Sequence, residues 1–309
     1  MIIFLATHRY THTHLAKGAP FDLQMRSYHW ALKSLALPRA TYIFSDFDRL
    51  GPWELELAAR LYQQLKAAGM RVLNDPARAL QRLSLLRRLY SAGFNSFQVW
   101  RVEDHEKPDR FPVFLRTQAA HRGVLTDLLE TPEAAEAALQ SALNEGYTRR
   151  DLMFVEYCAE PVKPDLFRKL AGFRIGDKMI PALCVHEAKW TAKYGSIGIA
   201  GAALYEDEAD IIKTNRYGEQ LRAAFDLADI EYGRADFGMA RGKMQIYEIN
   251  TNPDVRTIGE HPFQIRMDAE KHFFQMIREG LEAIDTPNGG RAVTPEGLIF
   301  RRSANTNGR

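Results

Sequence analysis

The sequence from Tyr232 to Asp254, YGRADFGMARGKMQIYEINTNPD, decides the fold prediction. Its second half contains MQIY, a compact apolar and aromatic run that is typical of a β-strand. Gly242 and Lys243 stand directly before that run and supply a turn. The stretch therefore predicts a hairpin of two short strands.

Three side chains with oxygen atoms surround this hairpin: Asp236, Glu248 and Asn250. Glu248 and Asn250 are two residues apart, so they point to the same face of an extended strand. Asp236 lies 12 residues before Glu248, a span that lets one strand run out and its partner return beside it. Two carboxylates and an amide oxygen on one face suit Mg²⁺ or Mn²⁺ held together with nucleotide phosphates. An ordinary hairpin with a polar solvent face is the alternative that these residues leave open.

A resemblance to a known family rests on the same residues. The run ADFG at Ala235–Gly238, followed by YEINTNP at Tyr247–Pro253, resembles the metal-binding signature of the ATP-grasp superfamily. In that family an Asp, and then a Glu and an Asn in an E-x-N-x-x-P setting, hold the magnesium ions that bridge the phosphates of ATP. The resemblance implies that Asp236, Glu248 and Asn250 are metal ligands and that the cofactors are ATP and Mg²⁺ (or Mn²⁺).

The composition is that of a soluble globular chain, with 309 residues, 46% of them hydrophobic and 26% charged. A net charge of +2 gives no reason to expect a nucleic-acid or membrane partner. Cys158 and Cys184 are too few for a disulfide framework or a zinc site, so we interpret them as thiols in a reducing compartment. The first residues, MIIFLATHRY, are interpreted as a buried strand and not a signal peptide, and we expect a cytoplasmic protein.

The first 75 residues follow a strand–helix–strand rhythm. Ile2–Ala6, Ala40–Phe44 and Met70–Leu73 are apolar runs of strand length, and Pro52–Ala68 has leucines at helical spacing. Runs that are apolar on both faces suit a covered parallel sheet. The order therefore predicts a right-handed βαβ unit.

Two loops after these strands carry polar side chains: His8, His12 and His14 in the first, and Asp46 and Asp48 in the second. We interpret the histidines as surface or substrate-contacting residues and not as a metal site. The aspartates stand beyond the carboxyl end of a strand, where ligands bind in open α/β sheets. Alternatively, they cap the helix that begins near residue 52.

A basic helix is predicted over Ala77–Ala92, with Arg82, Arg87 and Arg88 on it. The simplest interpretation of these arginines is a solvated face. The resemblance implies that one basic residue of this helix approaches the nucleotide, and the sequence does not assign which one.

The region from residue 96 to residue 160 resembles the small nucleotide lid of ATP-grasp proteins. It contains a predicted strand over Phe111–Arg116, a helix beginning with Thr131-Pro132, and a second strand over Asp151–Tyr157. The family usually has a phosphate-binding lysine where this chain has Arg116. Arginine can hold a phosphate, but its planar fork is not equivalent to an ammonium group.

The end of the second lid strand corresponds to the hinge at which adenine packs in the family. The resemblance places Glu156 and Tyr157 there, with Glu156 or Glu160 as the carboxylate for the ribose hydroxyls. The residues alone also allow a plain acidic strand edge.

Further cations are candidates for the phosphates. Arg168 and Lys169 precede a predicted hairpin that turns at Gly176-Asp177, and Lys193 closes the run HEAKWTAK. In the family, a basic residue that enters this strand reaches the triphosphate or the acyl phosphate. Lys193 is therefore both a nucleotide-binding and a catalytic candidate.

Arg256, just after the metal signature, is the candidate cation for the transferring phosphoryl group or the developing tetrahedral centre. The glycines around residue 198 do not have the spacing of a dinucleotide-binding loop, and a Walker A sequence is absent. Nucleotide binding would therefore use neither of the two common glycine-loop architectures.

Two more helices are predicted, over Ala209–Leu227 and Phe263–Ile284. Together these patterns predict an α/β protein of ATP-grasp type, in which two α+β subdomains clamp ATP. The expected regions are an N-terminal α/β domain over 1–95, a nucleotide lid over 96–160, a metal-binding subdomain over 161–285 and a mobile tail over 286–309.

The predicted function is that of an ATP-dependent carboxylate–amine ligase, or a carboxylate–thiol ligase, acting through an acyl phosphate. Ligases related to glutathione synthetase and the ribosomal-protein glutamate ligases are the nearest resemblance. The partners would be small-molecule or peptide carboxylates and amines, and a homo-oligomer stays open. A non-ligating ATP-binding sensor and an ATP-grasp kinase acting on a hydroxyl are the alternatives.

Overall fold

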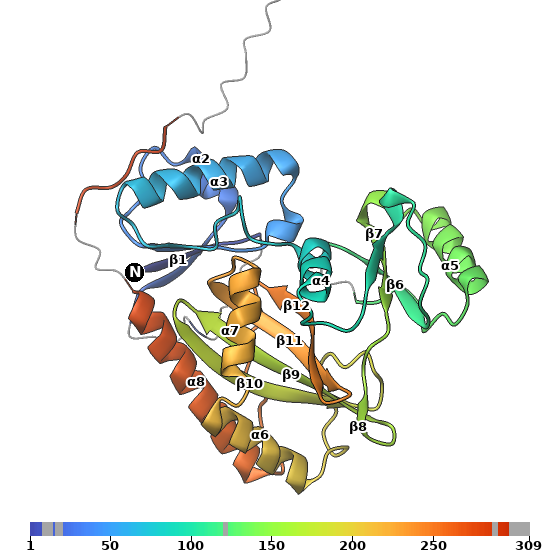
Figure 1. Cartoon of the computed structure of the whole chain (residues 1–309). Coiled ribbons are helices and arrows are strands. Elements are labelled where there is room, and N and C mark those ends of the chain that lie inside the picture. The colour runs from blue at the N-terminus through green and yellow to red at the C-terminus, as the bar shows by residue number, and fades with distance from the viewer. Residues whose placement is uncertain (8–14, 16–20, 120–122, 286–289, 297–309) are drawn as a thin grey trace, which may run out of the picture.

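The computed structural model of the chain describes residues 1–7, 15, 21–119, 123–285 and 290–296. Three β-sheets follow one another along the sequence (Figure 1). The N-terminal sheet lies at one end of the molecule, the third sheet lies beneath it, and the second sheet projects to one side. The described residues contain no helix that is long and apolar enough to cross a membrane.

The N-terminal sheet is parallel and has the order β2-β1-β3-β4. Its strands are β1 (Ile2–Leu5), β2 (Leu23–Arg26), β3 (Thr41–Phe44) and β4 (Val72–Leu73). Helix α3 (Pro52–Ala67) covers one face, as its leucine spacing predicts, together with the short helix α2 (Tyr28–Lys33). Strand β2 and helix α2 were not predicted because each is very short: LQMR alternates apolar and polar residues, but over only four positions.

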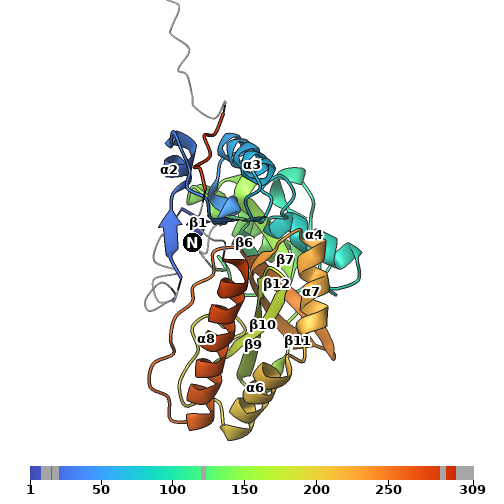
Figure 2. The same ribbon diagram turned by 90° about the vertical axis from the view of Figure 1, so that its left-hand side faces the viewer.

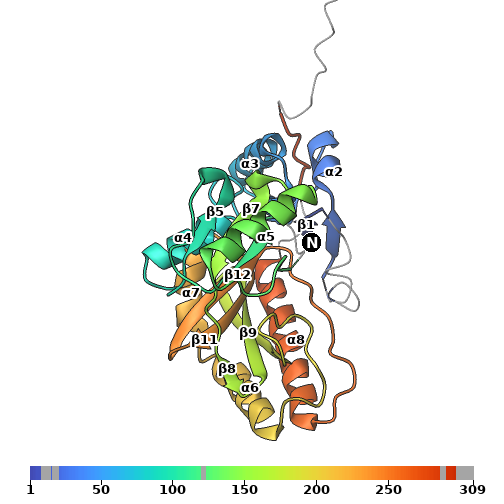
Figure 3. The ribbon, with the colours of Figure 1, turned by 90° about the vertical axis from the view of Figure 1, so that its right-hand side faces the viewer.

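The second sheet is antiparallel, with the order β5-β7-β6. Its strands are β5 (Val99–Arg101), β6 (Val113–Thr117) and β7 (Leu152–Glu156), and helix α5 (Pro132–Asn144) packs on it (Figure 3). The hydroxyl of Thr131 accepts a hydrogen bond from the backbone N–H of Ala134, which confirms the predicted start of that helix.

The third sheet is antiparallel, with the order β10-β9-β11-β12 and β8 paired to β9. Its strands are β8 (Pro161–Lys163), β9 (Leu166–Ile175), β10 (Lys178–Glu187), β11 (Tyr232–Ala240) and β12 (Lys243–Asn250). The predicted hairpin is present, but its turn lies one residue earlier than expected. Arg241 and Gly242 have φ angles of 51° and 71°, a pair of positive values that suits a two-residue hairpin turn, so Lys243 already belongs to β12.

Three helices pack against the third sheet: α6 (Ala202–Thr214), α7 (Gly218–Leu227) and α8 (Gln264–Ile284) (Figure 2). The single helix predicted over Ala209–Leu227 was wrong. Asn215 ends α6 in the left-handed region with φ of 50°, and its side-chain amide donates to the carbonyl of Met179 on β10. This tertiary contact overrides the helical periodicity and divides the segment into α6 and α7.

The basic helix α4 (Arg82–Ser91) begins later than the predicted residue 77. The carboxylate of Asp75 accepts the N–H of Ala77, and the N–H of Leu80 donates to Ala228 at the end of α7. These bonds hold the preceding residues in turns, so the helix starts only at Arg82.

Part of the expected mobile tail packs on the N-terminal domain. Leu37 and Val293 exchange two backbone hydrogen bonds of 2.7 and 2.8 Å, and Gln64 bonds both backbone groups of Glu296. Residues 290–296 therefore lie against the first domain and are hydrogen-bonded to it. The rest of the region, 286–289 and 297–309, lies outside the described residues.

Candidate functional site

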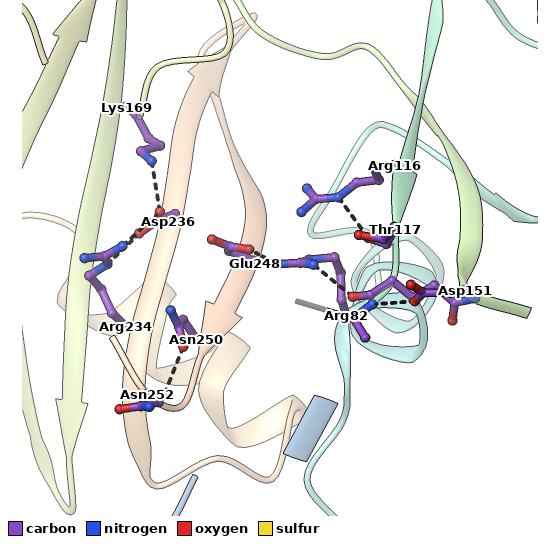
Figure 4. Close-up of polar contacts among 12 residues, drawn as sticks. Arg82, Arg116, Thr117, Asp151, Lys169, Arg234, Asp236, Glu248, Asn250 and Asn252 are labelled. Atoms are coloured by element: carbon purple, nitrogen blue, oxygen red, sulfur yellow. Dashed lines mark hydrogen bonds and ion pairs between the residues drawn. The ribbon is translucent and has the colours of Figure 1, made fainter. Parts of the chain in front are cut away.

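The hairpin β11–β12 places four polar side chains in a two-by-two array. Asp236 lies opposite Glu248, and Arg234 lies opposite Asn250. Residues two apart on a strand share a face and directly opposed residues are neighbours, so all four project to the same side (Figure 4). The register shifts just beyond Asp236, where β12 has one extra residue, Tyr247.

Asp236 is almost fully buried and is bound by two cations. Arg234 Nε donates to its carboxylate at 2.7 Å, and Lys169 Nζ from β9 lies 3.1 Å away. Buried carboxylates need such partners because desolvation of an unpaired charge is costly. Lys169 was a predicted site residue, whereas Arg234 was missed. Its position two residues before Asp236 places it on the same strand face and could have revealed it.

Glu248 forms an ion pair with Arg82, which reaches it from α4. Arg82 also donates through Nη1 to the carbonyl of Gln118, at the end of β6, at 2.8 Å. Arg87 instead pairs with Asp104 and Glu106 on the lid surface, and Arg88 is exposed. The structure thus brings Arg82, of the three arginines on this helix, to the site.

Asn250 ties the hairpin to the loop that follows it. Its side-chain oxygen accepts the N–H of Asn252 at 2.9 Å, and the amide of Asn252 donates to Asp46 at 2.9 Å. Asp46 also accepts two hydrogen bonds from Thr7. The alternative that Asp46 or Asp48 caps α3 was wrong: Gly51 precedes α3 and its N–H donates to the carboxylate of Glu54, and Asp46 instead connects the N-terminal sheet to the hairpin.

A first cavity of about 490 Å³ lies between the second and third sheets. Its walls are largely apolar and aromatic, and Trp190 packs on Phe114 and Tyr157 with ring centroids 4.8 and 5.5 Å apart. The six predicted nucleotide-binding residues line this cavity: Arg116, Glu156, Tyr157, Arg168, Lys169 and Lys193. The predicted nucleotide-binding residues thus come together around one cavity of nucleotide size.

Two of these residues have partners that the sequence does not reveal. Glu156 accepts the N–H of Gln98 and pairs with Arg110 at 2.9 Å, and Arg168 pairs with Asp207 at 2.6 Å. Burial lowers the pKa of Arg116 to about 9, and the neighbouring charge of Arg82 contributes to the lowering.

A second cavity, of about 880 Å³, opens on the other side of the array. It is lined by charged and polar side chains, among them Asp236, Glu248, Asn250, Lys193 and Arg256. Arg256 lies on the segment after β12, is largely exposed and pairs with Asp254 at 2.5 Å. Both predicted catalytic residues, Arg256 and Lys193, therefore face this cavity.

The loop that carries Lys193 is held by one carboxylate. Glu187 Oε1 accepts the N–H groups of Lys193, Tyr194 and Gly195 at 2.6–2.9 Å. Burial alone would raise the pKa of the Glu187 carboxyl. The three hydrogen bonds lower this pKa by more than burial raises it, so the net shift is downward. Glu187 is therefore ionised and fixes the loop on which Lys193 stands.

The two cavities meet at four shared side chains: Lys169, Lys193, Asp236 and Glu248. Two cations and two acids thus lie where a molecule bound in the first cavity would contact a molecule bound in the second. An aromatic compartment and a charged compartment with a common charged wall can hold two different molecules with their reacting groups in contact.

The oxygen donors at this wall suit a hard divalent ion. Among the described residues there is no cluster of three or more His, Cys, Asp or Glu side chains that could hold a metal ion. Asp236, Glu248 and Asn250 fit Mg²⁺ only as a partial set that phosphate oxygens complete, which is the usual arrangement for this ion. His8, His12 and His14 lie outside the described residues.

Comparison with solved structures identifies the fold. The D-alanine–D-alanine ligase of Bacillus anthracis, solved in complex with ATP, aligns over 90% of this chain and 98% of its own, with 10% identity and a TM-score of 0.51. An ATP-grasp RimK domain protein of Sphaerobacter thermophilus aligns over 91% of this chain and 99% of its own, with 14% identity and a TM-score of 0.49. No family model and no curated protein matches the sequence. The chain therefore has the fold of the ATP-grasp superfamily, as its hairpin signature predicts.

Proposed function

We propose that the protein is an ATP-dependent ligase that activates a carboxylate as an acyl phosphate and joins it to an amine, releasing ADP and phosphate. The observation that carries this proposal is the charged wall shared by the two cavities. A nucleotide in the first cavity would place its terminal phosphate at Lys169 and Lys193. A carboxylate in the second cavity would then meet that phosphate at the same side chains.

The first cavity would hold the nucleotide through distinct groups. Aromatic walls including Trp190 would take the base, Glu156 or Glu160 the ribose, and Arg116 with Arg168 the phosphates. Asp236, Glu248 and Asn250 would hold Mg²⁺, which, when bound, neutralises charge on the phosphates. Arg82, Arg234 and Lys169 pair with the two acids in this structure, and with the metal bound they would turn towards the phosphate oxygens instead.

Arg256 and Lys193 would act on the reacting carboxylate. Both line the second cavity, and Arg256 is exposed enough to reach a bound group. Their charges would orient the carboxylate towards the γ-phosphorus and stabilise the negative charge that develops when the amine attacks the acyl carbon.

The test is release of ADP from ATP and Mg²⁺ by the full chain in the presence of pooled amino acids and short peptides. ADP release that requires an amine, together with a condensed product by mass spectrometry, is expected. Matched controls are Glu248→Gln at the shared wall and Glu219→Gln on the exposed face of α7. ADP release with a phosphorylated hydroxyl product would instead indicate a kinase, and nucleotide binding without turnover in any pool would indicate a sensor.

A further inference from the structure

The second cavity extends well beyond the shared wall. Apart from the four shared side chains, it is also lined by Tyr205 from α6, His261 from the segment before α8, and Arg266 from α8. These three residues are called the distal cluster below. None of them lines the first cavity, so the distal cluster contacts only what occupies the second one.

Arg266 is held rigidly in this cluster. Its Nη2 donates to the carbonyl of Cys184 at 2.9 Å, and its guanidinium lies over the ring of Tyr205 at 4.9 Å. The fully buried Glu208 lies 3.7 Å from its Nε. A guanidinium that is already oriented loses little conformational entropy when it binds an anion.

His261 adds a neutral donor. Its Nδ1 accepts the N–H of Phe263 at 3.2 Å, so in the neutral ring the proton sits on Nε2. Burial, followed by the charge of Arg266, lowers the pKa of His261. Its ring packs edge-on against Tyr205 at 4.8 Å, so Tyr205 positions both His261 and Arg266.

The charges define the kind of ligand. The second cavity is lined by six Arg and Lys side chains and by four Asp and Glu side chains, so it favours an anion. Within the distal cluster Arg266 already faces Glu208, and His261 is neutral. This arrangement suits the single charge of a planar carboxylate better than the double charge of a phosphate.

We propose that the distal cluster binds a carboxylate of the amine substrate, through Arg266 and the Nε2–H of His261. The nucleophilic partner would then be an amino acid or peptide whose free carboxylate is held by the distal cluster while its amine reaches the shared wall. The proposal rests on the proposed ligase function and adds the chemical class of the second substrate.

The kinetic test compares each free amino acid or dipeptide with its carboxamide as the amine in the ADP-release assay. The carboxamides are expected to lose about 10- to 100-fold in kcat/KM, through KM, because a charge-assisted hydrogen bond is lost. Arg266→Gln should make acid and amide equivalent, whereas Arg278→Gln, at an exposed position of the same helix, should change nothing. Equal use of acid and amide by the wild type would overturn the proposal.

A second measurement separates this subsite from the ligase activity. Binding of the same acid and amide pairs, and of the aminophosphonate analogue of alanine, is measured without nucleotide by ligand-observed NMR. Binding that requires the carboxylate and is lost in Arg266→Gln supports the subsite even if no amine is ligated. No preference for the acids, or tighter binding of the aminophosphonate, rejects it whatever the kinetic result.

Discussion

The two cavities of this protein differ in how they are built. The first is walled mainly by side chains of strands and of helix α4, including Phe114, Val155 and Tyr247, and six aromatic rings stand among its charged residues. The second is walled largely by segments between elements, residues 193–197 and 254–261, and its surface is mainly charged. Both nevertheless end at the same four side chains.

This contrast indicates which of the two cavities determines substrate specificity. Residues on strands have positions fixed by register, so the first cavity can keep its shape while loop sequences change. The second cavity depends on loops and on individual cations, which is where proteins of one fold vary their substrates. Substitutions at the shared wall should therefore affect both cavities, and substitutions elsewhere should affect only one.

The largest effect is expected at the shared wall. Glu248→Gln should lower turnover by about 1000-fold and weaken Mg-nucleotide binding, because an amide cannot replace the charge of a metal ligand. The near-isosteric side chain should leave the fold intact, as checked by circular dichroism and thermal unfolding. Calorimetric titration with a non-hydrolysable nucleotide measures the binding loss. Full activity at ordinary Mg²⁺ concentrations would remove Glu248 from the metal site.

A smaller effect, on turnover but not on nucleotide affinity, is expected from Arg256→Gln. Arg256 lines only the second cavity, and its exposed pair with Asp254 contributes little to stability. Turnover should fall by about 100-fold, since one preorganised charge is lost, while nucleotide affinity stays unchanged. Steady-state kinetics and nucleotide titration on the same preparation test this separation. A parallel loss of nucleotide affinity would show that the two cavities are not independent at this residue.

The reverse pattern, a loss of nucleotide affinity with an unchanged KM for the acceptor, is expected from Trp190→Leu. Loss of the ring contacts with Phe114 and Tyr157 should weaken nucleotide binding by about fivefold, corresponding to roughly 1 kcal/mol of aromatic packing. The KM for the acceptor should not change, because Trp190 does not line the second cavity. Trp190→Phe, which keeps an aromatic ring, serves as the matched control and should lose less affinity.

Much of the polar array on β11 and β12 could be predicted from the sequence, because strand periodicity determines the direction of side chains. The two-residue spacing of Glu248 and Asn250 placed both on one face, and the length of the hairpin placed Asp236 opposite Glu248. The same rule applied to Arg234 would have found it. The ends of the predicted strands and α3 also agree closely with the structure, because their apolar runs are bounded by turn residues.

The rest depends on contacts between distant segments, which no local pattern encodes. The break at Asn215 comes from a hydrogen bond to β10, and the late start of α4 comes from a bond to the end of α7. The pairing of Arg82 with Glu248 joins residues 166 positions apart. The distal cluster likewise combines Tyr205 of α6 with His261 and Arg266, more than 50 positions later in the sequence, so no local pattern describes it.

The smallest effect at neutral pH is expected from Arg116→Lys, at the phosphate end of the first cavity. Burial lowers the pKa of Arg116 to about 9, with Arg82 adding to the effect, so its charge is kept at neutral pH. Lysine also keeps a positive charge when protonated, and nucleotide affinity should change by no more than about threefold. A much larger loss at neutral pH would show that the phosphates require the planar guanidinium.

The pH dependence of this variant sharpens the test. A protonated cation attracts phosphate, and a guanidinium holds its proton more strongly than an ammonium group, so nucleotide affinity of the wild type should decline only at the alkaline end of the range although burial lowers the pKa of Arg116. Lysine starts from a lower ordinary pKa, about 10.4, and the same burial should bring its loss of affinity to a lower pH than in the wild type. Nucleotide titrations from neutral pH to about pH 10 compare the two profiles. Superimposable profiles would mean that residue 116 carries no charge that the nucleotide senses, and the first cavity would then bind its phosphates through Arg168, Lys169 and Lys193 alone.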